Sequence, residues 1–98
     1  MATFISTVKF TDQGIKDIKA TCKRASAFKA TVEKMGIEVK NIFWTLGAFD
    51  GLVVFDAPDD ETATAAMLHL DSFGNVHTQT TRAYQAEEME QILGKLSG

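Results

Sequence analysis

The sequence predicts an α+β domain in which a four-stranded antiparallel sheet carries two helices on one face. Its 98 residues are enough for one domain and too few for two. Four segments are rich in β-branched and aromatic residues, and two longer segments between them repeat apolar residues every three or four positions. Right-handed crossovers between strands in this order produce such a sheet.

The first half of the chain begins with a predicted strand at residues 3–10 and continues as one long helix. Thr11 or Asp12 can cap the N-terminus of that helix, and Gly36 suits a left-handed residue at its end. The stripe of apolar residues that predicts the helix consists of Ile15, Ile18, Cys22, Ala25, Phe28, Val32 and Met35. We therefore expect Cys22 to be a buried structural cysteine.

A hairpin and a second helix follow. Residues 37–46 and 52–55 read as strands, and the glycines and Asp50 between them tolerate the dihedral angles of a turn. Pro58 and the three acids after it suit the first turn of a helix, which Gly74 and Asn75 end.

The C-terminal part adds a fourth strand at residues 76–83 and a third helix at residues 86–96. The complete order is β-α-β-β-α-β with an added C-terminal helix. We therefore expect residues 1–98 to form a single ferredoxin-like domain.

The two hairpin strands carry apolar side chains on both faces. In the first, Ile42, Trp44 and Leu46 oppose Ile37, Val39 and Phe43; in the second, Leu52 and Val54 oppose Val53 and Phe55. If one face stayed in water, the fold would lose about 25 cal/mol of stabilising free energy for each Å² of apolar surface left exposed. Either the C-terminal helix folds back over that face or a second copy covers it. We favour the second copy, which predicts a dimeric α+β barrel or a larger homo-oligomer.

Composition excludes several functional classes. A net charge of −3 and a pI near 5.2 disfavour nucleic-acid binding. One cysteine and two histidines cannot form an internal disulfide or a zinc site, and we expect no metal and no cofactor. The N-terminus does not resemble a signal peptide, and no segment is long and apolar enough to span a bilayer. We expect a cytoplasmic protein without a membrane partner.

Five residues are candidate liners of a binding pocket: Trp44, Phe49, Asp50, His77 and Arg82. They favour a small-molecule binding or regulatory module, because no pair of residues has a spacing that demands catalysis. The alternative is a cofactor-independent oxygenase or isomerase, with His77 or Asp50 as the base and Arg82 or Trp44 as a hydrogen-bond donor. Turn formation by Asp50 and ordinary strand hydrogen bonding by His77 are the simpler interpretations.

Three stretches carry a resemblance to a known family: Trp44 to Asp50, Ala57 to Ala63 and Gly74 to Thr80. Together with Thr11 to Ile15 they resemble, in the same order, the GYD-domain family of small bacterial and archaeal proteins. The resemblance implies a ferredoxin-like fold and supplies no catalytic residues. The chain departs from the Gly-Tyr-Asp signature, because Phe49 stands where the family has tyrosine, which removes any role of a phenol hydroxyl there.

Overall fold

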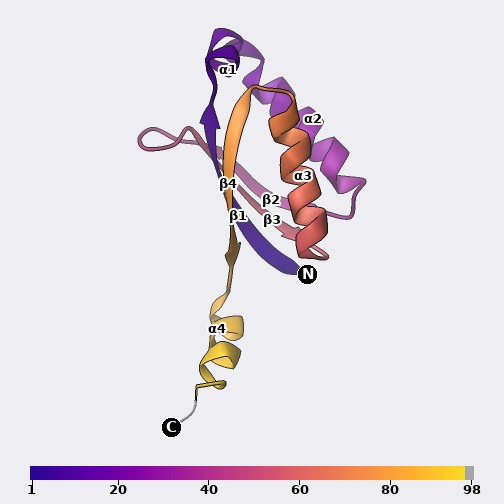
Figure 1. The fold of residues 1–98 in the computed structure, drawn as a ribbon, viewed down its shortest axis with the longest axis vertical. Helices are drawn as coiled ribbons and strands as arrows, with labels where there is room; N and C mark the ends of the chain where they lie inside the picture. Colours follow the sequence, from indigo (N-terminus) through magenta and orange to yellow (C-terminus); the bar gives the residue numbers. More distant parts are fainter. Residues whose placement is uncertain (97–98) are drawn as a thin grey trace.

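The computed structural model describes residues 1–96 and has the predicted α+β architecture (Figure 1). Its elements in chain order are β1 (Ala2–Phe10), α1 (Asp12–Lys16), a 3-10 turn η1 (Ile18–Ala20), α2 (Thr21–Glu33), β2 (Glu38–Trp44), β3 (Gly51–Ala57), α3 (Asp60–Ser72), β4 (Val76–Ala83) and α4 (Ala86–Leu93). The antiparallel sheet has the order β2-β3-β1-β4. Helices α2 and α3 cover one of its faces (Figure 1).

The core lies between this helix-covered face and the two helices. Phe4 and Phe55 stack on neighbouring strands with ring centroids 5.5 Å apart. Val32 of α2 and Ala66 of α3 are fully buried against them. These contacts confirm the apolar stripe in the second half of the first predicted helix and most of the stripe in the second, whose last member, Phe73, lies just after α3 and is 60% exposed.

The long first helix predicted from residue 15 to residue 35 is wrong in its first part. The chain forms α1, turns through η1 and starts again as α2. Ile15 and Ile18 are therefore 54% and 38% exposed, and Cys22 is an exposed free thiol rather than a buried one. The break allows α1 to stay against the start of β4 while α2 crosses the sheet. This arrangement depends on contacts between distant segments, which the spacing of apolar residues along the sequence does not indicate.

Strand β2 contains a bulge, which changes the side of the sheet on which some of its side chains lie. Val39 pairs with Phe55 and Ile42 pairs with Val53, with a register shift between Val39 and Asn41. The extra residue places Val39 on the same side as Ile42, so the predicted opposition of these two side chains is wrong. The open face of the sheet, defined here by Ile5, Phe43, Leu52 and Val54 with their polar neighbours, still carries an apolar centre.

Helix α4 does not fold back over the open face, so that alternative is wrong. It stands beyond the end of the sheet, where β4 leads into it (Figure 1). Arg82 holds the junction: it forms an ion pair with Glu88 at 3.0 Å, and its guanidinium lies 4.6 Å from the centroid of the Tyr84 ring. Within residues 1–96, no helix is long and apolar enough to cross a membrane.

Candidate functional site

A cavity of about 250 Å³ opens between α2, α3 and the helix-covered face of the sheet. Its walls are mostly apolar and come from every layer of the fold. The main apolar liners are Phe10, Phe28, Ile42, Val53, Leu70, Phe73 and Val76. The polar liners are Thr21, Arg24, Thr31, Asp50, His69 and Asn75. An apolar hollow with a few polar groups at defined positions is typical of small-molecule sites.

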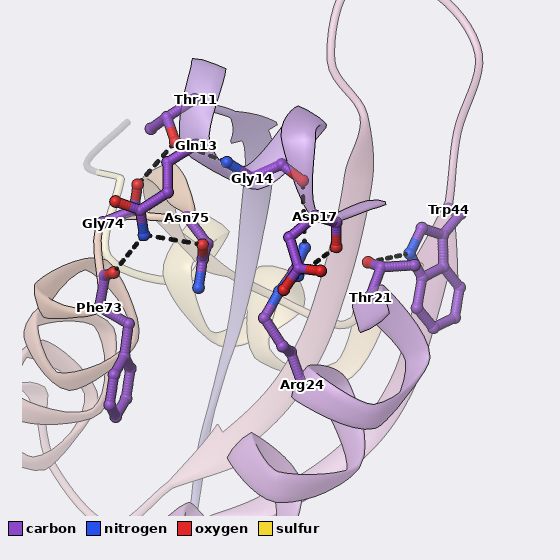
Figure 2. Close-up of polar contacts among 10 residues, drawn as sticks. All are labelled: Thr11, Gln13, Gly14, Asp17, Thr21, Arg24, Trp44, Phe73, Gly74 and Asn75. Atoms are coloured by element: carbon purple, nitrogen blue, oxygen red, sulfur yellow. Dashed lines mark hydrogen bonds and ion pairs between the residues drawn. The ribbon is translucent and has the colours of Figure 1, made fainter. Parts of the chain in front are cut away.

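A hydrogen-bond network beside the cavity ties α1 to the loop between α3 and β4 (Figure 2). The Gln13 side-chain amide donates to the Phe73 carbonyl and to Asn75 Oδ1, both at 2.9 Å. Thr11 Oγ1 donates to the Gly74 carbonyl at 2.6 Å. Because Phe73 and Asn75 also line the cavity, this network fixes the position of one of its walls.

Arg24 fixes the neighbouring wall. Its guanidinium donates to the Asp17 carbonyl at 2.6 Å and to the Gly14 carbonyl at 3.4 Å, and it lies 3.4 Å from Asp17 Oδ2 (Figure 2). These bonds join α2 to the break after α1. The arginine thus serves the local backbone and at the same time presents part of its side chain to the cavity.

Trp44 closes the cavity at the edge strand β2. The indole Nε1 donates to Thr21 Oγ1 of α2 at 3.0 Å (Figure 2), so the ring bridges the sheet and the helix. Trp44 is nevertheless 46% exposed. The sequence-predicted liner therefore lies at the cavity, and its binding of a ligand stays a prediction.

Asp50 also lies at the cavity, with its carboxylate already occupied by the backbone. Oδ2 accepts a hydrogen bond from the Phe10 amide at 2.9 Å, and the backbone of Asp50 bonds to Val8 and Thr45. This geometry matches the turn-forming interpretation. The Asp50 carboxylate therefore already holds the backbone of β1 through the Phe10 amide.

The other three candidates lie elsewhere. Phe49 belongs to the β2–β3 hairpin, where its carbonyl accepts from Thr45 Oγ1 at 2.7 Å. His77 is exposed on the open face, because it alternates with Val76, which lines the cavity on the other side of the sheet. Arg82 borders a separate shallow hollow beside α3. His77 and Asp50, the two alternative bases, are therefore not brought together in one site, since the sheet separates their side chains.

Two liners were missed as site residues. His69 lies half-buried on α3 and meets the Phe73 ring edge-on at 5.0 Å, and Arg24 lies on α2 as described above. Their positions beside apolar helical stripes were visible in the sequence. Only the gap between α2 and α3 makes them neighbours of one cavity.

The family assignment follows from comparison with known proteins. Residues 4–93 match the GYD domain. The chain belongs to the GYD domain family. This GYD domain is 32% identical over 90 residues to a protein of Thermus thermophilus named glutamine synthetase and cystathionine beta-lyase binding protein, covering 91% of this chain and 95% of the relative.

Solved structures with the same fold show how widely it is used. MtbAldR superposes with a TM-score of 0.63 at 14% identity over 86% of this chain, which spans about half of MtbAldR (53%). The 5-chloro-2-hydroxyhydroquinone dehydrochlorinase TftG of Burkholderia phenoliruptrix AC1100 gives 0.62 at 12% identity, with 90% and 98% of the two chains covered. An ACT domain protein from Streptococcus pneumoniae gives 0.50 at 18% identity, covering 85% and 90%. These likenesses confirm the fold of this GYD domain and not an activity.

Proposed function

We propose that this GYD domain binds a small, largely apolar molecule between α2, α3 and the sheet, as a regulatory module. The cavity of about 250 Å³ carries the proposal, because apolar side chains line most of it and Arg24, His69 and Asn75 add donors and acceptors at its edge. We expect an aromatic or branched apolar ligand with one polar group.

A cavity-filling substitution tests the site. Ala25 is a half-buried liner on α2, whereas Ala30 of the same helix is exposed and is not a liner. We expect that thermal-shift screening with small aromatic and branched-chain acids and alcohols finds stabilising compounds. A ligand at 100 times its Kd adds about 2.7 kcal/mol to the free energy of unfolding. Ala25→Phe should abolish the shift and Ala30→Phe should preserve it.

The result that would contradict the site is equally specific. Equal shifts in both variants would place the ligand elsewhere. Failure of every compound to stabilise the folded chain would favour the partner-protein role described below.

We also propose that a second copy covers the open face. Ile5, Leu52 and Val54 are half-buried there, and Phe43 is 50% exposed. Sedimentation at micromolar concentration should give at least twice the 10.7 kDa of one chain. Val54→Lys should shift the distribution to monomer because it places a charge in the centre of the apolar face.

A second candidate function is binding of a partner enzyme. The specific observation is the relative that is named for binding glutamine synthetase and cystathionine beta-lyase, which matches this chain over nearly its whole length. Calorimetric titration of both enzymes, taken from the source organism of this chain, into the purified chain tests this role. Absence of heat and of co-sedimentation with both enzymes would contradict it.

A further inference from the structure

Two apolar features of the protomer have no partner within residues 1–96, and they lie at opposite ends of the sheet. The first is the stripe formed by Met89, Ile92 and Leu93 of α4 and by Leu96 just after it, of which Leu96 is 72% exposed. The second is the tip of the β2–β3 hairpin, residues 45–50, where Leu46 is completely exposed. Figure 1 shows the hairpin projecting on the side of the sheet away from α2 and α3, and α4 beyond the other end.

We propose that α4 of one copy packs against the β2–β3 hairpin of a second copy of this chain. This deepens the self-association proposed above and rests on it. A two-fold axis perpendicular to the strands, lying between two facing open faces, reverses the strand direction of the second copy. The same operation brings the α4 end of each copy to the hairpin end of the other, so both contacts form together.

The charges favour this antiparallel arrangement. Helix α4 is acidic on its polar side, with Glu87 and Glu90 exposed. At the hairpin end of the open face, Lys9 is exposed, with Nζ 3.4 Å from the Ala48 carbonyl of the hairpin, and it pairs across the strands with His77. Opposite charges therefore meet when the strands of the two copies run in opposite directions. In the parallel arrangement the two acidic helices would meet instead.

The area of the sheet also favours the two end contacts. Four strands about 4.8 Å apart with residues about 3.3 Å long make a face of roughly 25 Å by 19 Å, or about 480 Å². A standard interface buries about 800 Å² on each partner. The helix and the hairpin both carry further exposed apolar side chains, and these can supply the difference.

Arg82 holds α4 in a fixed direction relative to the sheet, which favours this contact. Its guanidinium donates to the Thr3 carbonyl at 3.2 Å and to Glu88 Oε2 at 3.0 Å, and it also bonds the Ala83 carbonyl. One side chain thus links β1, the end of β4 and the first turn of α4. A helix held in a fixed direction loses less conformational entropy when it docks.

Disulfide trapping tests whether α4 of one copy packs against the hairpin of the other. In a Cys22→Ser background, which removes the exposed native thiol, the double variant Leu46→Cys/Leu93→Cys should form covalent dimers under mild oxidation. Each single cysteine variant should stay monomeric on a non-reducing gel. The matched control is Leu68→Cys/Leu93→Cys, because Leu68 is 65% exposed on α3 and lies outside the proposed contact.

A second measurement uses the unaltered chain. An equal mixture of ¹⁴N- and ¹⁵N-labelled protein treated with a short amine cross-linker should give a mixed-isotope Lys9–Lys95 peptide pair, since Lys9 lies at the hairpin end and Lys95 follows α4. The contact between α4 and the hairpin would be overturned by a dimer in sedimentation that lacks this peptide pair, or by covalent dimers of the single Leu93→Cys variant. Self-association itself would still hold in either case. A monomer by sedimentation would overturn both.

Discussion

Replacement of Gly14 by alanine should destabilise the fold through one close backbone approach. A Cβ atom at Gly14 would lie 2.0 Å from the Asn75 carbonyl oxygen and 3.0 Å from its carbon. These are backbone atoms that cannot rotate away, and the same oxygen accepts the Thr11 amide at 3.0 Å. Either α1 or the start of β4 must therefore move, which strains the network around Gln13.

The expected magnitude combines opposing effects. Overpacking of this kind costs about 1–3 kcal/mol, strain in the Thr11–Asn75 bond adds up to about 1 kcal/mol, and the better helix propensity of alanine returns up to about 1 kcal/mol. The last two contributions roughly cancel, and the remaining loss of about 1–3 kcal/mol corresponds to a fall in Tm of roughly 4–24 °C for a domain of this size.

Urea denaturation followed by circular dichroism measures this loss. Gly94→Ala is the matched control, because Gly94 has ordinary helical dihedrals (φ −62°, ψ −17°) and, apart from its two chain neighbours, the nearest atom to its added Cβ is the Gln91 carbonyl oxygen at 3.3 Å. We expect the control to change the free energy of unfolding by less than about 0.5 kcal/mol. A Gly14→Ala variant as stable as the control would refute the reasoning.

Three further predictions follow from single contacts. Phe55 is 1% exposed in the core, so Phe55→Ala should lower the free energy of unfolding by about 3–5 kcal/mol; a urea-melt loss under about 1 kcal/mol would contradict the packing described. Asp50→Ala removes the acceptor of the Phe10 amide and should lower the free energy of unfolding by about 1–3 kcal/mol. An unchanged urea melt would mean that this hydrogen bond does not stabilise the fold. Hydrogen bonds from the Gln85 amide and from Arg82 hold the pKa of Glu88 below its ordinary value. The contribution of Glu88 should therefore be fully present above its unfolded pKa of about 4.3 and should disappear as the pH falls through the lowered folded pKa; NMR shifts of α4 amides should follow this titration, and Glu88→Gln should remove it.

The sequence determined the elements whose signals are local. The β-branched and aromatic residues of β1, the capping by Thr11, the acids at the start of α3 and the apolar stripe from Phe28 to Met35 all report directly on backbone geometry and burial. The left-handed residue expected at Gly36 is present with φ +88°. Element order then restricts the topology to the observed antiparallel sheet.

The tertiary structure alone decided the break after α1, the bulge in β2 and the position of α4. Periodicity from Ile15 to Met35 is compatible with one straight helix, yet the close approach of Gly14 to Asn75 joins residues far apart in the sequence, which no local pattern encodes. The bulge next to Lys40 turns Val39 toward the core without changing the apolar composition of the strand.

The candidate site follows the same division. Sequence reasoning found Trp44 and Asp50 because an aromatic residue and a turn carboxylate stand out in the hairpin. It grouped His77 with them because alternation along β4 does not say which of its two faces meets the helices. The cavity itself, with Arg24 and His69 in its wall, exists only because α2 and α3 lie apart on the sheet, and that spacing is set by packing between distant segments.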